Sequence, residues 1–158
     1  MPVEEMSPNA LSGAHGRNKI TQFNLECAWL SNFWPCRVAV DGELYSSVEA
    51  AYVASKTLDL NMRYVVQAAK TPAICKRIGR TLELRPGWNA MSIPVMRSLL
   101  EQKFAPNTEL AEWLLATGNA ELIEGNHWGD TFWGVCRGKG SNHLGRLLME
   151  IRTQLNQS

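Results

Sequence analysis

The chain has 158 residues, which is enough for one domain with a sizeable hydrophobic core. Hydrophobic residues make up 45% of it and charged residues 20%, a globular balance that argues against a disordered or a membrane-embedded protein. Sixteen basic and fifteen acidic residues leave a net charge of +1, which argues against a surface dedicated to coating nucleic acid.

A flexible leader is expected over residues 1–18, followed by a single domain over residues 19–158. The leader contains Pro, Ser, Asn and Gly and has little apolar periodicity. After it, I-T-Q-F (Ile20–Phe23) and R-V-A-V-D-G-E-L-Y (Arg37–Tyr45) are typical of strands. Asp41-Gly42 predicts a turn within the second segment and therefore a hairpin.

Helix signals dominate the rest of the chain, where cap residues, prolines and glycines set the expected bounds. The sum is an α+β fold, a mostly helical single domain around a small antiparallel sheet. The first expected helix begins after Ser46 and ends at about Thr57, and the second begins at Asn61 or Met62 and ends before Thr71. The third runs from Thr71-Pro72 to Gly79, and the fourth opens at Ser92 and Pro94. The fifth runs from Asn107 to Gly118, and the last begins near Asn142. Two short strands are expected at Glu121–Glu124 and Trp133–Arg137.

The predicted helix S-S-V-E-A-A-Y-V-A-S-K (Ser46–Lys56) places charge on an otherwise apolar surface. Glu49, Tyr52 and Lys56 lie at i, i+3 and i+7, along one stripe of the helix. A carboxylate and an ammonium in a buried helix pair with each other, pair elsewhere or face a cavity. The alternative is a capping box, in which Ser46 caps the helix and Glu49 bonds back to the backbone N–H of the cap. Both interpretations remain open from the sequence.

Six tryptophans are a rich supply for this length, and four of them stand beside turn signals. Aromatic rings in glycine-bounded loops are candidates for stacking a planar ligand. A single ring of this kind more often fills the core. Trp29 and Trp113 lack the loop context and are expected to fill the core. The four loop tryptophans are Trp34, Trp88, Trp128 and Trp133.

A glycine-rich loop, G-D-T-F-W-G-V-C-R-G-K-G-S-N-H-L-G (Gly129–Gly145), leads into the last predicted helix. Its second half is either a phosphate-binding nest, with Arg137, Lys139 and Arg146 supplying charge, or a turn with Asn142 as the N-cap. It is not a P-loop, because the G-K-[ST] ending is absent.

No metal and no redox cofactor is expected. The four cysteines form no C-x-x-C pair, and His127, His143 and Asp130 have the spacing of no standard metal site. Reduced thiols in a cytoplasmic protein are expected instead. Apolar runs fall short of the ~20 residues of a membrane span, so no membrane association is expected. The cysteines are Cys27, Cys36, Cys75 and Cys136.

Several short motifs follow one another in a fixed order along the chain. They are L-S-N-F-W-P (Leu30–Pro35), D-G-E-L-Y-S-S-V-E-A-A-Y-V-A-S-K (Asp41–Lys56), A-A-K-T-P (Ala68–Pro72), G-R (Gly79–Arg80), P-G-W (Pro86–Trp88), K-F (Lys103–Phe104), L-L-A-T-G (Leu114–Gly118) and the Gly129–Gly145 loop. Over roughly residues 21–155 this set resembles the NADAR superfamily, also called the YbiA-like family.

The resemblance implies one compact domain that hydrolyses N-glycosidic bonds of ribosyl compounds. One branch of the family acts on phosphorylated intermediates of riboflavin biosynthesis, and another removes ADP-ribose from guanine, including guanine in DNA. The functional positions of the family map to Glu49, Trp88, Asp130 and Trp133. The family usually has His and Gln where this chain has Ala50 and Val53, and each change removes a polar group from the motif helix.

The expected mechanism gives Glu49 and Asp130 the catalytic roles, because cleavage of a ribosyl–nitrogen bond needs carboxylates to orient water and steady positive charge. Asp130 and Trp133 are expected to face Glu49 across the cleft. Expected partners are a small ribosyl or ADP-ribosyl substrate and, in one branch, ADP-ribosylated DNA. The alternative function is a sensor that binds ADP-ribose or NAD without hydrolysis. The expected substrate-binding residues are Asn32, Phe33, Tyr52, Lys56, Trp88, Trp133, Gly134, Arg137, Lys139, Gly140 and Asn142.

Overall fold

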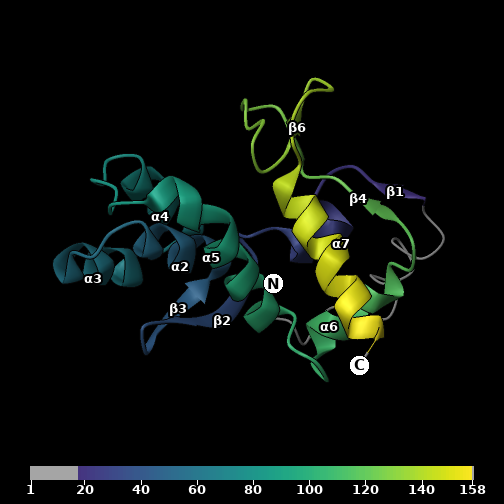
Figure 1. The fold of residues 1–158 in the computed structure, drawn as a ribbon, viewed down its shortest axis with the longest axis horizontal. Coiled ribbons are helices and arrows are strands. Elements are labelled where there is room, and N and C mark those ends of the chain that lie inside the picture. Colours follow the sequence, from purple (N-terminus) through teal and green to yellow (C-terminus); the bar gives the residue numbers. More distant parts are fainter. Residues whose placement is uncertain (1–17, 158) are drawn as a thin grey trace. The chain divides into compact units, whose positions relative to one another are not determined.

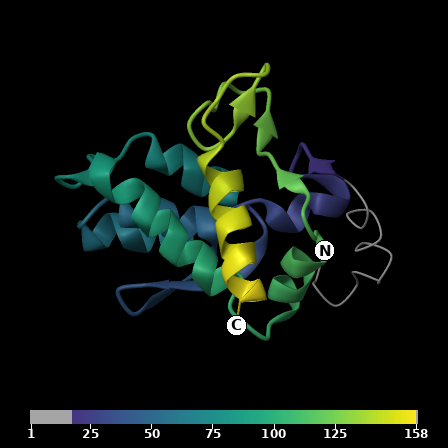
Figure 2. The ribbon, with the colours of Figure 1, turned by 45° about the vertical axis from the view of Figure 1, so that its right-hand side comes forward.

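The computed structural model describes residues 18–157, so the expected leader lies outside the described residues except for Asn18. Those residues form seven helices and three two-stranded sheets, which confirms the mostly helical α+β class (Figures 1 and 2). The chain divides into two compact units. One unit is the continuous segment 32–103, and the other combines residues 18–31 with residues 104–157.

The segment 32–103 begins with a hairpin made of β2 (Pro35–Val40) and β3 (Glu43–Ser47), which pair antiparallel. Asp41 and Gly42 form its turn with φ angles of 49° and 83°. Two successive positive φ angles are what a two-residue type I′ hairpin turn requires, and Asp-Gly is among its favoured sequences. The predicted hairpin is confirmed.

Helix α2 (Val48–Ser55) follows the hairpin directly, and every residue in it except Glu49 is buried. Ser47 is its N-cap, and its Oγ accepts the backbone N–H of Ala50 at 3.0 Å. The predicted capping box with Ser46 is therefore wrong, because Glu49 stands at the second helical position instead of the third. The helix lies at the centre of its unit and contacts α3, α4, α5 and both hairpin strands.

Helices α3 (Leu60–Ala68) and α4 (Pro72–Gly79) each begin at a side-chain cap. The Asp59 carboxylate accepts the backbone N–H groups of Asn61 and Met62. Helix α3 therefore begins at Leu60, one to two residues before the predicted start at Asn61 or Met62. The Thr71 hydroxyl accepts the N–H of Ile74 at 3.2 Å with Pro72 at the first helical position, as predicted.

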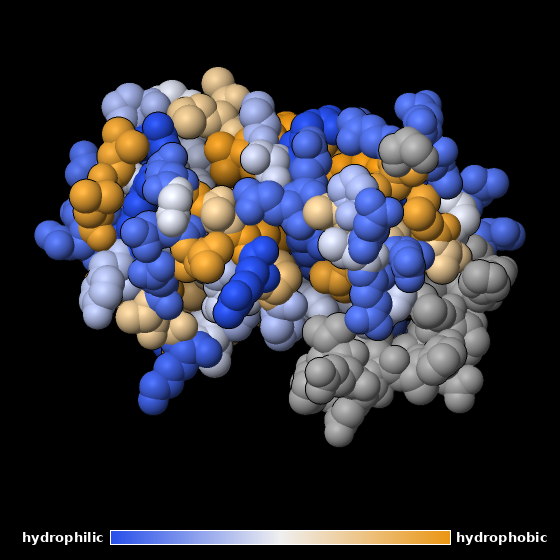
Figure 3. All heavy atoms as spheres, turned by 90° about the horizontal axis from the view of Figure 1, so that it is seen from below, coloured by the Kyte–Doolittle hydropathy of each residue, from blue (hydrophilic) through white to orange (hydrophobic). Residues whose placement is uncertain are grey.

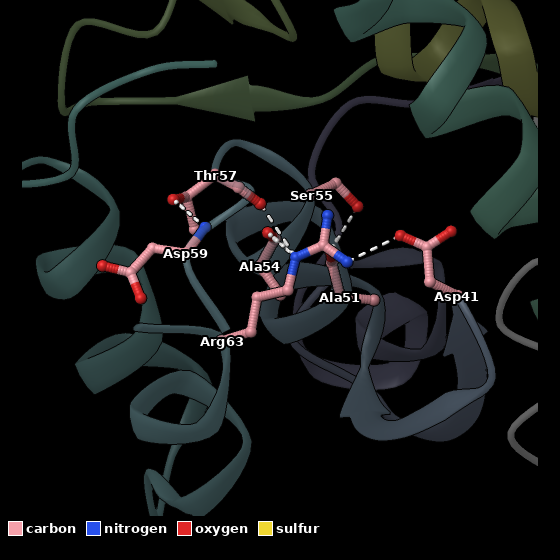
Figure 4. A network of polar contacts seen from close by, with 7 residues as sticks. All are labelled: Asp41, Ala51, Ala54, Ser55, Thr57, Asp59 and Arg63. Atoms are coloured by element: carbon pink, nitrogen blue, oxygen red, sulfur yellow. Dashed lines mark hydrogen bonds and ion pairs between the residues drawn. The ribbon is translucent and has the colours of Figure 1, made fainter. Parts of the chain in front are cut away.

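Arg63 of α3 is buried and joins three elements (Figure 4). Its Nε donates to the carbonyl oxygens of Ala54 at 3.1 Å and Thr57 at 2.8 Å, at the C-terminal end of α2. Its Nη1 donates to Asp41 Oδ2 at 2.6 Å in the hairpin turn. The guanidinium thus caps the helix that carries Glu49 and fixes that helix to the hairpin.

Helix α5 (Trp88–Lys103) begins four residues before the predicted start at Ser92, and that prediction is wrong. Its actual start signal is the turn before it, where the Trp88 N–H donates to the Arg85 carbonyl at 3.2 Å and Gly87 has a φ of 75°. Proline followed by a positive-φ glycine is typical of a type II turn. Pro94 lies inside the helix at an exposed position.

The other unit has an aromatic core around Trp29 of the short helix η2 (Leu25–Leu30). The Trp29 ring centre lies 6.2 Å from that of Phe104 and 5.8 Å from that of Trp113, which is in α6 (Glu109–Ala116). Burial of Trp29 and Trp113 confirms that both fill the core. Helix α6 is capped by Thr108 because Asn107, the predicted first residue, has a left-handed φ of 66°.

Two parallel strand pairs complete this unit, where the sequence predicted antiparallel pairing. β1 (Lys19–Ile20) pairs with β4 (Glu121–Leu122), and β5 (Gly125–Asn126) pairs with β6 (Val135–Cys136). Each strand has two residues, so the strands predicted at Glu121–Glu124 and Trp133–Arg137 were placed correctly but were too long. The strand predicted at Ile20–Phe23 overlaps β1 only at Ile20. β5 was not predicted, because a Gly-Asn pair has neither strand periodicity nor a β-branched residue.

Helix α7 (His143–Asn156) begins after Asn142, as predicted. It buries Arg152, whose Nη1 donates to the Thr117 hydroxyl at 2.8 Å at the end of α6.

None of the helices in residues 18–157 is both long and apolar enough to cross a membrane. On the face drawn in Figure 3, several hydrophobic patches lie among hydrophilic residues.

Candidate functional site

The stripe predicted on α2 brings two side chains into direct contact. The Lys56 Nζ lies 5.2 Å from the centre of the Tyr52 ring, within range of a cation–π interaction. The Tyr52 ring in turn lies 5.3 Å from the ring of Trp88, at the start of α5. Three of the predicted substrate-binding residues therefore adjoin one another.

The Glu49 carboxylate acts electrostatically on Lys56, one of these three residues. Burial lowers the pKa of the Lys56 ammonium below its ordinary value, the Glu49 carboxylate raises it, and Lys76 lowers it further. Burial also raises the pKa of the Cys75 thiol, and the Glu49 charge adds to that rise. One carboxylate and two ammonium groups thus act on each other where α2 meets α4.

Glu49 is held in place through its backbone and lies at the one position of α2 that is not fully buried. Its N–H donates to the Asn32 carbonyl at 3.0 Å, and the Asn32 Nδ2 contacts the Met96 sulfur at 3.6 Å. The Asn32 Oδ1 is buried without a hydrogen-bond partner among the described residues. The L-S-N-F-W-P motif therefore holds the start of the Glu49 helix, and a carboxylate there is favoured by the helix dipole.

Phe33, from the same motif, contributes a partly exposed ring to this group. The Lys76 Nζ lies 6.0 Å from the centre of that ring. The sequence had not marked Lys76 for the site, because a lysine in the last turn of a helix is typical of simple dipole compensation. The pairing of Phe33 with Lys76 depends on tertiary packing alone.

Ala50 and Val53, the two departures from the family pattern, are 2% and 1% exposed. Val53 packs against Gly79 of α4, where an added methyl carbon would lie 3.0 Å from the Val53 Cγ2 and 3.6 Å from the Lys56 Nζ. The apolar residue at position 53 therefore serves close packing of α2 on α4.

Gly79→Ala is expected to destabilise the chain by about 1–3 kcal/mol, because the new methyl group would overpack the interior against a stiff β-branched side chain. Helix propensity alone would predict the opposite sign, a gain of up to about 1 kcal/mol. Urea denaturation measures the change. In the double variant Gly79→Ala/Val53→Ala the methyl group has room, so its cost should be smaller than the sum of the two single costs. A Gly79→Ala variant as stable as the parent chain would contradict this packing.

The Asp130 loop belongs to the other unit and is built by its own hydrogen bonds. The Asp130 Oδ1 accepts the backbone N–H groups of Phe132 at 3.1 Å and Trp133 at 2.9 Å. The Asn126 side chain accepts the Asp130 N–H at 3.0 Å and donates to the Asp130 carbonyl at 2.8 Å. One oxygen of the predicted catalytic aspartate therefore shapes the loop.

Trp133 lies in an aromatic group within the same loop. The Phe132 ring centre is 4.8 Å from that of Trp133 and 4.6 Å from that of His143, the first residue of α7. Phe132 and Trp128 remain 44% and 52% exposed, and Trp133 is half-buried. The loop thus presents aromatic surface, which agrees with a stacking role without showing one.

The second half of the loop forms a tight turn. Cys136 and Lys139 exchange backbone hydrogen bonds around Arg137 and Gly138, whose φ angles are 52° and 75°. The Arg137 and Lys139 side chains are exposed. At Gly140 a side chain would overlap the carbonyl of Gly134, so close backbone approach requires glycine.

Asn142 was expected to cap α7 or hold phosphate, and the structure engages its side chain elsewhere. Its Nδ2 donates to the Leu122 carbonyl at 2.9 Å and its Oδ1 accepts the Glu124 N–H at 3.0 Å. The prediction of Asn142 as the N-cap is confirmed in position, but its side chain makes no capping hydrogen bond and its backbone is left-handed. The side chain instead joins the start of α7 to the β4 segment.

The cysteines are all free thiols, of which Cys36 is partly exposed. Within residues 18–157, His, Cys, Asp and Glu side chains nowhere gather in a group of three that could hold a metal ion. Together the geometry shows a charged group on α2 and α4 in one unit and an aromatic loop in the other.

Comparison with known proteins identifies the family. Residues 21–156 match the NADAR domain, a range that includes parts of both units. N-glycosidase YbiA of Escherichia coli K12 is 40% identical over 130 residues, 79% of each chain. Riboflavin biosynthesis protein VVA0006 of Vibrio vulnificus is 39% identical over 132 residues, which are 82% of this chain but 36% of that longer protein.

A solved structure supports the same assignment. The NMR structure of the E. coli protein YbiA matches with a TM-score of 0.77 at 34% sequence identity, and the match covers 91% of this chain and 92% of that one. Sequence and structure thus agree over most of the length of both chains. The chain belongs to the NADAR family, among its YbiA-like N-glycosidases.

Proposed function

We propose that this chain hydrolyses the N-glycosidic bond of a ribosyl compound, with Glu49 as the catalytic carboxylate. The observation that carries the proposal is the position of Glu49. It is the one residue of α2 that is not fully buried, it lies in the S-V-E motif, and its charge acts on Lys56 and Cys75. Perturbed ionisable groups gathered in this way are typical of catalytic sites.

Hydrolysis breaks the bond between the ribose C1′ and a nitrogen, and a water oxygen forms a new bond to C1′. Positive charge develops on the sugar while the electron pair of the broken bond moves to the nitrogen. The Glu49 carboxylate steadies the cation and accepts a proton from the attacking water. The protonated Glu49 then gives this proton, directly or through water, to the departing nitrogen, so the base leaves in its free form and Glu49 is a carboxylate again.

Neighbouring residues of the same unit supply the rest of the site in this proposal. Lys56 holds the substrate or tunes Glu49, since the Glu49 charge acts on the Lys56 ammonium and raises its pKa. Tyr52 and Trp88 provide adjacent aromatic surface for the base. Asn32 and Phe33, from the motif that holds Glu49, complete the wall.

In this proposal Asp130 is the second catalytic carboxylate, and its loop supplies further substrate-binding residues. The Asp130 Oδ1 is engaged with the loop backbone, so its Oδ2 is the atom we assign to the ribose or to proton transfer. Trp133 and Gly134 provide stacking surface and close backbone approach, and Arg137, Lys139 and Gly140 form a turn with accessible charge. These roles rest on the family motif.

A phosphorylated ribosylamino intermediate of riboflavin biosynthesis is the first substrate to test, because two similar proteins, from Vibrio vulnificus and Zea mays, are named for that pathway. ADP-ribosyl-guanine is the second. We place hydrolysis ahead of sensing, because Ala50 and Val53, the two departures from the family pattern, lie in the packed interior.

The test incubates the purified chain with each substrate and follows free base by chromatography. Release from either substrate, absent without the chain, supports the N-glycosidase. Tight binding with the ligand intact would contradict hydrolysis and favour the sensor.

A further inference from the structure

One face of α4 lies against the stripe of α2 that carries the proposed chemistry. The Lys56 Nζ reaches this face at Gly79, 3.6 Å from where a methyl carbon would stand. Residues three and four apart share a helix face, so Cys75 and Lys76 project from the same side of α4 as Gly79. Cys75 is buried on that side and Lys76 is half-buried, whereas Arg77 is exposed.

This face brings two ammonium groups, those of Lys56 and Lys76, close to the Glu49 carboxylate. Lys56 and Lys76 lie close enough for one to lower the pKa of the other, and the Glu49 carboxylate is the negative charge that acts on Lys56. Partial burial strengthens the attraction between such ammonium groups and an anion, because fewer waters screen it.

The Lys76 side chain is also oriented by its surroundings. Its Nζ lies 6.0 Å from the ring centre of Phe33, which belongs to the motif that holds the start of α2. A cation kept over an aromatic ring loses less side-chain freedom when it binds a ligand. Lys76 is thus directed to the Glu49 side of α4.

We propose that Lys76, together with Lys56, forms an anion subsite that takes the phosphate of a 5′-phosphorylated ribosyl substrate. The proposal rests on the N-glycosidase function above and makes Lys76 the residue that distinguishes phosphorylated from unphosphorylated ribose. It also assigns the phosphate to α4 instead of the Arg137–Asn142 segment, for which the sequence left a phosphate nest and a simple turn open.

A simpler explanation is that Lys76 compensates the helix dipole at the C-terminal turn of α4. Arg77 stands in the same turn, carries the same charge and is exposed. Arg77→Gln is therefore the matched control, because it removes an equal charge from the same turn on a different face of the helix.

The experiment measures binding of ribose 5-phosphate and of ribose by calorimetry, using the whole chain and its Lys76→Gln, Lys76→Arg and Arg77→Gln variants. The parent chain should bind ribose 5-phosphate more tightly than ribose. Lys76→Gln should weaken ribose 5-phosphate binding by about tenfold or more, as loss of a charge-assisted hydrogen bond predicts. Ribose binding should stay unchanged.

The variants separate this proposal from its alternatives. Lys76→Arg should keep most of the phosphate preference and Arg77→Gln all of it, with thermal melting showing that each variant is folded. Equal losses in Lys76→Gln and Arg77→Gln would overturn the subsite, as would unchanged binding in Lys76→Gln. Base release plays no part in the measurement, so a chain that binds ribose 5-phosphate but releases no base would contradict the proposed function alone.

Discussion

Glu49→Gln is expected to reduce base release by about 10²–10⁴-fold, the usual contribution of a positioned acid–base group. Glutamine has nearly the same shape, so the contacts of α2 should remain, but its amide neither accepts a proton from water nor carries negative charge. The measurement is single-turnover release of free base, with circular dichroism showing that the helices persist. The cost in stability should stay below about 1 kcal/mol, the size of one charge at a helix start.

A second readout of the same variant does not depend on turnover. The Glu49 charge raises the pKa of the Lys56 ammonium, so its removal should lower that pKa further. The Lys56 titration can be followed by NMR of a labelled lysine side chain. Glu83→Gln, at an exposed position of the same unit, is the control and should leave both activity and the Lys56 titration unchanged.

Base release by Glu49→Gln within a factor of a few of the parent chain would remove Glu49 from the catalytic role. Asp130 would then be the next carboxylate to examine. Asp130→Asn suits that purpose, because asparagine keeps an Oδ1 acceptor for the loop backbone while it loses the charge.

Arg63→Met is expected to destabilise the chain by about 2–4 kcal/mol, since a buried hydrogen bond from a charged group contributes about 1.5–3 kcal/mol. The substitution removes the Arg63 Nε hydrogen bonds to the carbonyls of Ala54 and Thr57, of which Ala54 keeps the Thr57 N–H at 3.3 Å, and it keeps most of the apolar stem. Urea denaturation followed by circular dichroism measures the loss. Because α2 loses its cap, base release should also fall before the chain unfolds.

Asp41→Asn removes the ion pair between Asp41 and Arg63 but leaves the Arg63 hydrogen bonds that cap α2, so it measures the ion pair alone. The Arg63 hydrogen bond and charge lower the pKa of the Asp41 carboxyl below its ordinary value of 3.8. The pair therefore stabilises the chain at neutral pH, and this contribution disappears as the pH falls through the lowered pKa. Asp41 is largely exposed, so the loss should be small, and asparagine also accepts the left-handed turn. Equal costs for the two variants would contradict the assignment of the main effect to the helix cap.

Local chemistry explains which parts of the fold the sequence could predict. A two-residue hairpin turn needs positive φ angles, which Asp41-Gly42 accepts, and a helix start suits the fixed φ of proline, which Thr71-Pro72 supplies. The hairpin and the start of α4 were therefore predictable. The choice between Ser46 and Ser47 as the cap was not, because both residues are serine. It depends on the hairpin register, in which Ser47 pairs with Pro35 and ends the strand.

The candidate site was predictable only where it follows one helix. The stripe of Glu49, Tyr52 and Lys56 comes from helical periodicity, and its contact with Trp88 agrees with the motif assignment. Lys76 and Arg63 gave no such signal, since a lone cation in a helix is typical of a solvated face. Their roles arise from contacts with residues far away in the chain.

The path of the chain through its two units has a consequence for synthesis. Residues 32–103 emerge from the ribosome as one stretch, whereas Trp29 is made before them and its ring partners Phe104 and Trp113 after them. At about 5–20 residues per second, several seconds separate Trp29 from the aromatic rings that bury it. The unit that carries Glu49 therefore has time to fold before the aromatic core around Trp29 can close.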